Sequence, residues 1–229
     1  MSGEQRSIDG TNRKVRVAVI FGGQSGEHDV SLRSAQTVLS ALDDERFEAI
    51  PIGVTRDGRW LTGQDPMAQL TASSPLFALD GPAEPDVETL EIAVASTSQT
   101  LPSGLGADID VVFPVLHGPM GEDGTVQGLL ELAGIPYVGS NVLGSALAMD
   151  KAMAKLILEQ HGIPQAPWLL VNRRDWERDP GSVAGRIGDK LGYPCFVKPA
   201  NMGSSVGVSK VHNPTELGAA MELAGRLDR

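Results

Sequence analysis

Cysteine is nearly absent from the sequence: Cys195 is the only one, so no disulfide bond can form within the chain. It stands in the apolar run Cys195–Val197, where a buried structural thiol is more typical than a reactive nucleophile. The scarcity of cysteine also fits a reducing compartment. We therefore expect a cytoplasmic protein in which Cys195 is a core residue.

Long apolar runs are absent as well. No stretch approaches the roughly 18 apolar residues that a membrane-spanning helix needs. Residues 1–14 lack the apolar centre of a signal peptide. We expect no membrane partner and interpret residues 1–14 as a flexible tail.

Positive charge is scarce, with 19 Lys and Arg against 29 Asp and Glu and a net charge of −10. No basic stripe is present that could displace counterions, so we expect no nucleic-acid partner. Two nucleotide-binding motifs are missing too, since the chain contains neither GxxxxGKS/T nor GxGxxG. A small anionic ligand would have to meet a few local cations.

The composition is otherwise that of a globular protein, with 41% hydrophobic and 21% charged residues. The 27 glycines and 15 prolines indicate many turns. A chain of 229 residues can hold two small domains, each with its own core. We expect domains over residues 15–142 and 143–229, because GSNVL at 139–143 passes into a helix and the expected elements that follow suggest a small second domain.

The first apolar run, Val15–Phe21, ends at a glycine pair, which is typical of a buried parallel strand that opens a βα unit. The loop Gly22–Asp29 then lies at the carboxyl end of the strand, where open α/β sheets bind ligands. A helix follows, for which Asp29 or Ser31 is the expected N-cap. Glu27 has two interpretations: it caps this helix, or it faces the ammonium group of a ligand.

A second unit repeats this pattern. Ile109–Leu116 predicts a strand, residues 117–124 form a glycine-rich loop, and Thr125–Ala133 predicts a helix. His117 therefore lies at the same sheet edge as Glu27, and we expect the two loops to share one cleft. The alternative is a histidine that only packs within its loop.

Two adjacent acids, Glu122 and Asp123, lie in the second loop. Neighbouring residues rarely converge on one metal ion, so solvated or capping carboxylates are favoured over a magnesium site.

A small-residue turn, Ala200–Gly207, stands between Cys195–Val197 and Val206–Val211, which together predict a β-hairpin. Glycine lets backbone N–H groups approach a ligand closely and serine adds hydroxyl donors, a combination that suits phosphate oxygens. Lys198 enters the turn from an apolar strand, where a buried ammonium must pair with an acid or face a ligand. The alternative is an ordinary turn between two strands.

Further strands and helices follow from shorter patterns. The expected strands are Glu48–Val54, Leu90–Ala95, Ile135–Val138 and Trp168–Val171, with a hairpin turn at Thr55–Leu61. The expected helices are one that carries Asp150-Lys151 and runs to Gln160, one over Gly181–Leu191, and one over Pro214–Leu227. A solvated lysine that pairs with Asp150 is the alternative to a ligand-binding role for Lys151.

Four motifs together resemble the D-alanine–D-alanine ligases of the ATP-grasp superfamily. They are FGGQSGEHDVSL at 21–32, VFPVLHGPMGEDGTVQG at 112–128, GIPYVGSN at 134–141 with MDK at 149–151, and FVKPANMGSSVGVSKV at 196–211. The resemblance runs from about residue 15 to the last residue. It implies an α/β fold, in which a Rossmann-like parallel-sheet domain precedes an incomplete α+β ATP-grasp domain.

The resemblance implies a ligase for peptidoglycan precursor synthesis. Such an enzyme phosphorylates the carboxylate of one D-alanine with ATP, and the amine of a second D-alanine then displaces phosphate. Both steps develop negative charge, which needs nearby cations and N–H donors. By resemblance, Glu27 and Ser204 are the catalytic pair, with Glu27 holding the ammonium of the first D-alanine, and His117 lies near the substrate carboxylate.

The resemblance also implies an ATP site and a dimer. Lys151 and Lys198 match lysines that reach the ATP phosphates. Ser204, Ser205, Val206 and Gly207 match a mobile lid over these phosphates, whose closure excludes water from the acyl phosphate. Relatives dimerise through the amino-terminal domain, so we expect a homodimer.

The family continues beyond the matched region. The resemblance therefore places the ligands of Mg²⁺ or Mn²⁺, the adenine-binding strands and the loop that selects the second substrate outside this chain. We expect no metal ligands within it and impaired activity of the chain alone. Two alternatives stay open: a catalytically silent fragment that binds ligand weakly, and a D-alanine–D-lactate ligase.

Overall fold

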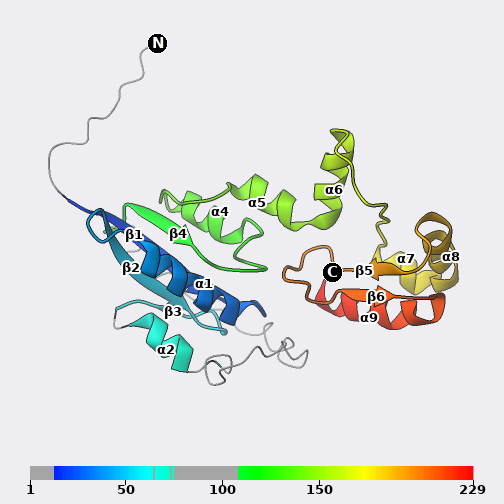
Figure 1. Cartoon of the computed structure of the whole chain (residues 1–229), viewed down its shortest axis with the longest axis horizontal. Helices are drawn as coiled ribbons and strands as arrows, with labels where there is room; N and C mark the ends of the chain where they lie inside the picture. The colour runs from blue at the N-terminus through cyan, green and yellow to red at the C-terminus, as the bar shows by residue number, and fades with distance from the viewer. Residues whose placement is uncertain (1–12, 64, 73, 75–107, 229) are drawn as a thin grey trace, which may run out of the picture.

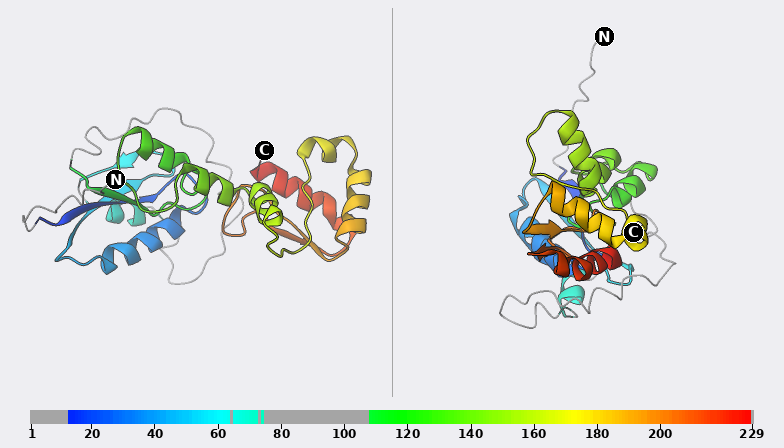
Figure 2. Two further views of the ribbon diagram at one scale, coloured as in Figure 1. Left: turned by 90° about the horizontal axis from the view of Figure 1, so that it is seen from above. Right: turned by 90° about the vertical axis from the view of Figure 1, so that its right-hand side faces the viewer.

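The structure, a computed structural model, describes residues 13–228 except 64, 73 and 75–107. It consists of two parts, each with its own sheet, which lie side by side (Figures 1 and 2). Helices α5 (Val142–Met149) and α6 (Lys151–Gln160) run from the first part to the second along the top of Figure 1. The expected strand Leu90–Ala95 and residues 1–12 of the expected tail lie outside the described residues.

The first sheet has the strand order β3-β2-β1-β4. Its central strand β1 (Val15–Gly22) pairs in parallel with β2 (Phe47–Val54) and β4 (Val111–Pro114), whereas β3 (Trp60–Leu61) is antiparallel to β2. The parallel central strands and the β2–β3 hairpin confirm the predictions made from the sequence. This sheet is mixed, because the hairpin adds one antiparallel edge strand.

Helices cover both faces of β1, which explains why its sequence is a near-continuous apolar run. Alternate residues of β1 face α4 (Thr125–Leu132) on one side and α1 (His28–Ala41) with α2 (Pro66–Ala72) on the other. The core on the α4 side contains Ala18, Ile20, Val112, Val126 and Leu130, and the core on the α1 side contains Val19, Phe21, Leu32, Ala35 and Leu70.

The second part is built on the antiparallel hairpin of β5 (Cys195–Val197) and β6 (Ser209–Val211). Helices α8 (Pro180–Lys190) and α9 (Leu217–Leu227) pack against it and form a separate core that includes the buried free thiol of Cys195. The hairpin and the core position of Cys195 confirm two predictions. The short helix α7 (Arg173–Arg178) was not expected, and the helix expected over Pro214–Leu227 begins with a 3₁₀ turn, η2 (Pro214–Glu216).

Three expected elements are wrong in type or extent. Trp168–Val171 is not a strand, because no other segment pairs with its backbone in the described part of the chain. Ile135–Val138 makes only a single bridge, between Val112 and Tyr137. The long helix expected around Asp150 is two helices, since Asp150 ends α5 and its side chain accepts from the N–H groups of the first turn of α6.

The expected N-cap of α1 is also wrong. The N-cap position is Glu27, and its side chain makes no capping bond. Ser31 is instead buried between helix and sheet, where its hydroxyl accepts from the Gly22 N–H at 2.8 Å and donates to the Val115 carbonyl at 2.5 Å. Asp29 pairs with Arg56 at 2.7 Å.

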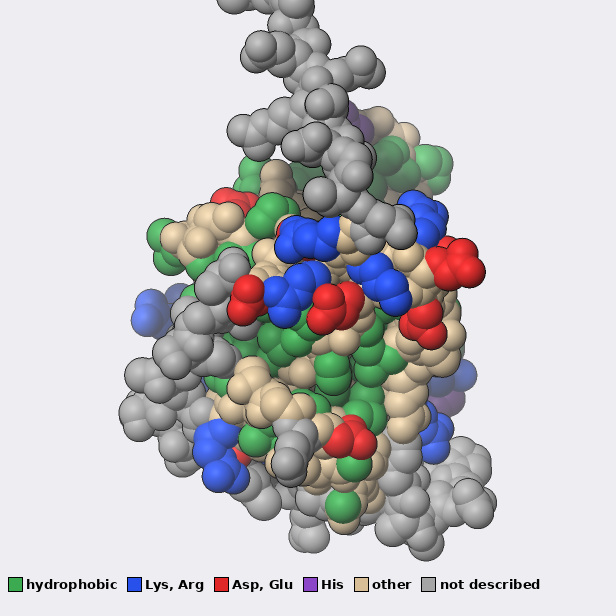
Figure 3. Space-filling view, turned by 90° about the vertical axis from the view of Figure 1, so that its left-hand side faces the viewer, with side chains coloured by type: hydrophobic (Ala, Val, Ile, Leu, Met, Phe, Trp, Pro, Cys, Tyr) green, Lys and Arg blue, Asp and Glu red, His purple; other side chains and the backbone are tan. Residues whose placement is uncertain are grey.

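Paired charges occupy the edge of the first sheet at which β1 begins (Figure 3). The guanidinium of Arg13 pairs with the carboxylate of Asp110. The guanidinium of Arg16 lies 2.9 Å from the carboxylate of Asp108 and 3.6 Å from that of Glu48. Arg13 and Arg16 at this edge thus have acidic neighbours. In the part of the chain that the structure describes, no helix combines the length and the apolar character that crossing a membrane requires.

Candidate functional site

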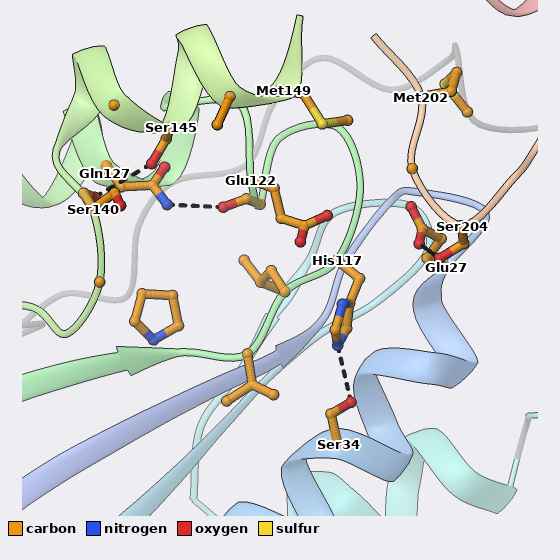
Figure 4. A pocket seen from close by; sticks show the side chains of 18 of the residues that line it. Glu27, Ser34, His117, Glu122, Gln127, Ser140, Ser145, Met149, Met202 and Ser204 are labelled. Carbon is orange, nitrogen blue, oxygen red and sulfur yellow. Dashed lines mark hydrogen bonds between the residues drawn. The ribbon is translucent and has the colours of Figure 1, made fainter. Parts of the chain in front are cut away.

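A cavity of about 750 Å³ lies where the carboxyl end of the first sheet meets loop 200–208, which we call the lid loop. Figure 4 shows side chains from α1, the loop after β4, α5 and the lid loop around it. The predicted site residues that line it are Glu27, His117, Lys151, Lys198, Ser204 and Ser205, and Glu122 of the second loop lines it as well. Val206 and Gly207 belong to the lid loop but do not line the cavity.

Glu27 is a buried carboxylate, only 4% exposed. Ser204 of the lid loop donates its hydroxyl to Oε1 (Figure 4), while Oε2 is buried and has no hydrogen-bond partner among the described residues. The capping interpretation of Glu27 is therefore wrong. A buried carboxylate oxygen without a donor is costly, so Oε2 is suited to accept a hydrogen bond from a ligand.

Two glycines enclose this carboxylate. A Cβ atom built on Gly203 of the lid loop would lie 2.7 Å from Oε2, and one built on Gly118 would overlap the same atom. Both loops approach Glu27 so closely that neither position has room for a side chain. The backbone of the lid loop thus rests directly on the carboxylate.

His117 is held at both its ring and its carbonyl group. Nε2 lies 2.9 Å from the Ser34 hydroxyl (Figure 4), and the His117 carbonyl accepts from the Ser25 hydroxyl at 2.6 Å. The Ser25 oxygen in turn accepts from the Glu27 N–H at 3.2 Å. These contacts join the two loops that the sequence predicted to share one cleft.

Lys151 points at the lid loop. Its ammonium donates to the carbonyl of Met202 and, at 3.4 Å, to that of Ala200. Asp150 does not hydrogen-bond to it among the described residues, and its carboxylate instead caps α6. Burial lowers the pKa of Lys151 below its usual value; Asp228 opposes this effect, and the neighbouring charge of Lys198 adds to it.

Lys198 differs from expectation. It is exposed, one residue beyond β5, with Nζ 5.8 Å from the centroid of the Phe196 ring. The prediction of a buried strand lysine is wrong, since the strand ends at Val197 and the side chain leaves the core. It still lines the cavity together with Lys151.

The lid loop has an unusual backbone. Ser204 and Ser205 have φ values of 41° and 62°, in the left-handed region that side-chain-bearing residues rarely adopt. Strained conformations of this kind cluster at ligand clamps and switch segments. The strain at the serine pair therefore distinguishes this loop from an ordinary turn.

The two adjacent acids have structural partners. Glu122 accepts from the Gly118 N–H at 2.6 Å, and Asp123 accepts from the N–H groups of Met120 at 2.9 Å and Thr125 at 3.0 Å. Among the residues that the structure describes, no group of three or more His, Cys, Asp or Glu could hold a metal ion. The described residues therefore do not fit a magnesium site.

Comparison with protein families identifies two regions of the chain. Residues 16–140 match the family described as "D-ala D-ala ligase N-terminus", and residues 157–229 match "D-ala D-ala ligase C-terminus". The chain belongs to the D-alanine–D-alanine ligase family. Its two matched regions correspond to the parts of the structure that carry the first sheet and the β5–β6 hairpin.

Individual relatives agree with this assignment. The chain is 49% identical to the D-alanine–D-alanine ligase of Deinococcus radiodurans and 48% identical to that of Natranaerobius thermophilus, and it covers 58% of the length of each. In both cases 94% of this chain is matched. The chain thus spans less than two thirds of the length of these ligases.

Solved structures show the same fold. The D-alanine-D-alanine ligase of Coxiella burnetii matches with a TM-score of 0.73 at 34% identity, over 94% of this chain and 61% of that one. The VanG D-Ala:D-Ser ligase of Enterococcus faecalis matches with a TM-score of 0.69 at 37% identity, with the same coverage. The α/β architecture is therefore that of ATP-grasp ligases.

Sequence reasoning missed two serines of this ligase-family site, Ser25 and Ser34. Ser34 follows Ser31 by three residues, so both hydroxyls lie on the same side of α1. Small polar residues that interrupt the buried face of a helix are the signal that could have identified Ser34, whereas Ser25 lies in the loop before α1.

Proposed function

We propose that this chain supplies the first-substrate end of an ATP-dependent D-alanine–D-alanine ligase that makes peptidoglycan precursors. In the first step, a carboxylate oxygen of one D-alanine attacks the γ-phosphorus of ATP, and the bond to ADP breaks. In the second, the amine of another D-alanine attacks the acyl carbon, phosphate leaves, and the nitrogen loses a proton. The observation that carries the proposal is the buried Glu27 oxygen Oε2, which has no protein donor among the described residues.

Glu27 accepts the ammonium group of the first D-alanine in this proposal. An ammonium supplies charge and N–H donors together, so it compensates the burial of Oε2 better than a neutral donor would. Ser204 keeps Oε1 occupied and so directs the ammonium to Oε2. His117, fixed by Ser34, faces the substrate carboxylate.

Lys151 and Lys198 hold the phosphates of ATP, with Ser204, Ser205, Val206 and Gly207 as the covering lid. Lys151 donates to lid-loop carbonyls in this structure, and we propose that phosphate oxygens replace them when ATP binds. Its partial burial supports this role, because a desolvated ammonium interacts more strongly with an anion than a hydrated one does. Bound ATP supplies the phosphoryl group.

The second substrate is proposed to be D-alanine. The names of the curated relatives from Deinococcus and Natranaerobius support D-alanine, whereas the VanG structure is named as a D-Ala:D-Ser ligase. A D-alanine–D-lactate ligase stays the alternative from the sequence. The described residues contain no contact that separates these acceptors.

Three further predictions accompany the proposal. We propose that the ligase acts in the cytoplasm, where ATP is supplied. We also propose that it forms a homodimer through the amino-terminal domain and that the domain boundary lies near residue 142. The separate cores on either side of α5 and α6 support the boundary.

The test measures ligand binding and phosphate release by the 229-residue chain. Calorimetry with D-alanine, in the presence of Mg²⁺ and the non-hydrolysable analogue AMPPNP, reports binding, and phosphate release from Mg-ATP with and without D-alanine reports chemistry. D-alanine binding without phosphate release supports a ligand-binding fragment of the ligase. Release that depends on D-alanine supports a complete reaction, and D-serine and D-lactate as second substrates then identify the acceptor. Absence of D-alanine binding overturns the proposal.

A further inference from the structure

His28, the residue after Glu27, is a histidine that the proposed reaction does not use. It is 2% exposed at the start of α1. Its Nδ1 lies 2.7 Å from the carbonyl oxygen of Gly23, at the other end of the loop that carries Glu27. A carbonyl oxygen can only accept, so Nδ1 carries the proton in this contact.

The imidazole packs tightly against the start of this loop. A Cβ atom built on Gly22 would lie 3.0 Å from Cε1 of His28. The N–H of Gly23 donates to the Val54 carbonyl at 2.8 Å, which ties the same residue to β2. His28 therefore links the helix to a loop segment that is already fixed on the sheet.

The loop between Gly23 and His28 carries two side chains that contact other parts of the site. Ser25 binds the His117 carbonyl, and Glu27 binds Ser204. The backbone N–H of His28 also donates to the Ser25 carbonyl, at 3.2 Å. Both side chains thus stand on a short loop whose two ends meet at His28.

We propose that His28 is a positioning residue: its Nδ1–H holds the Gly23 carbonyl and so fixes the loop conformation that presents Glu27 to the substrate ammonium. The identity of the ligand as D-alanine rests on the proposed function. The effect of His28 on the loop conformation does not depend on it. His28 acts through Glu27 and does not touch the substrate itself.

The surroundings keep the imidazole neutral. Burial lowers the pKa of His28, and Arg56 acts in the same direction, while the bond to Gly23 and the charge of Asp29 oppose them. Arg56 comes from the β2–β3 turn and pairs with Asp29 of α1 at 2.7 Å. The helix α2, which packs on α1, has no titratable residue. A neutral imidazole has one N–H group, and the Gly23 carbonyl accepts its hydrogen bond.

Two variants test this role through D-alanine affinity. His28→Asn keeps an N–H donor near the position of Nδ1, and His28→Leu keeps the volume without a donor. We expect His28→Leu to bind D-alanine about tenfold more weakly, the effect of losing one hydrogen bond, and His28→Asn to remain within about threefold. AMPPNP affinity should change little in either variant. The matched control is His161→Asn, at an exposed histidine after α6.

Equal D-alanine affinity of His28→Leu and the unmodified chain would overturn the inference, as would equal weakening by Leu and Asn. Two measurements decide it without any ligand. Long-range ¹H–¹⁵N spectra of the unmodified chain should show a proton on Nδ1 of His28, and amide exchange over residues 24–27 should be faster in His28→Leu than in His28→Asn. A proton on Nε2 with a bare Nδ1 refutes the role, whereas loss of D-alanine binding in the unmodified chain refutes only the proposed function.

Discussion

At the scale of single residues, the site depends on the charge of Glu27. Glu27→Gln keeps the shape of the side chain and removes its charge. We expect the D-alanine concentration for half-saturation to rise about 10- to 100-fold, because a hydrogen bond to a charged group is replaced by a neutral one. Affinity for AMPPNP should change much less. Calorimetry with each ligand measures both, and Glu159→Gln on the exposed side of α6 is the control.

An equal loss of affinity for the two ligands would contradict a specific role of Glu27 in holding the ammonium. It would indicate that the substitution disturbs the whole junction between the lid loop and the first sheet.

Gly203 gives a second prediction at this scale, because its backbone is outside the left-handed region and only space forbids a side chain there. In Gly203→Ala the new Cβ would lie 2.7 Å from Oε2 of Glu27, so either the carboxylate or the lid loop must shift and their contact is disturbed. We expect faster amide exchange at Ser204 and Ser205 and D-alanine binding about tenfold weaker, the scale of one lost hydrogen bond. Gly218→Ala in α9, where a Cβ meets no atom within 4 Å, is the control. Unchanged exchange would show that the loop does not need this contact.

The positions of Glu27 and His117 could be predicted from sequence, because both follow apolar runs that form neighbouring parallel strands. The exposure of Lys198 could not, since it depends on where β5 ends, and strand ends are weakly encoded. The contact of Ser34 with His117 could not either, because it joins side chains 83 positions apart.

At the scale of secondary structure, Asp150 determines where one helix ends and the next begins. Its carboxylate accepts from the N–H groups of Ala152 at 2.9 Å and Met153 at 3.0 Å. Asp150→Ala should lower the free energy of unfolding by about 1 kcal/mol, the typical effect of losing an N-cap. Urea unfolding followed by circular dichroism measures it, with the exposed Asp189→Ala in α8 as control. Equal stability of the two variants would show that Asp150 does not cap α6 in solution.

The expected strand at Trp168–Val171 shows why an apolar run does not determine an element by itself. Leu169 and Val171 are partly buried against the core of the second part, so the apolar residues of the run do pack there. A strand also needs a partner for its backbone, and that partner cannot be inferred from the run alone. The helices were better predicted, because α8 and α9 satisfy their backbone bonds internally and show their buried faces in the spacing of apolar residues.

At the scale of the whole molecule, a contact between residues 177 positions apart joins the two parts, since Ser204 of the lid loop bonds Glu27 of the first part. Each part has its own core, and among the described residues the Ser204–Glu27 bond and the close approach of Gly203 to Glu27 join the two parts. Such junctions permit relative motion of the two parts. The spacing of apolar residues predicted the separate cores but carries no information about polar contacts between loops, so only the family resemblance paired Glu27 with Ser204.

The stability of the molecule should decrease in mild acid because of His28. Burial holds its pKa below the ordinary value of 6.5, so the unfolded chain takes up a proton at a higher pH than the folded chain does. The contribution of neutral His28 to the free energy of unfolding is therefore fully present above pH 6.5. It is lost as the pH decreases from 6.5 towards the lower pKa of the folded state. Urea midpoints at about pH 7 and about pH 5 measure this loss, and the difference between the unmodified chain and His28→Asn isolates the part due to this histidine. The same pH dependence in both chains would show that His28 is not buried in its neutral form.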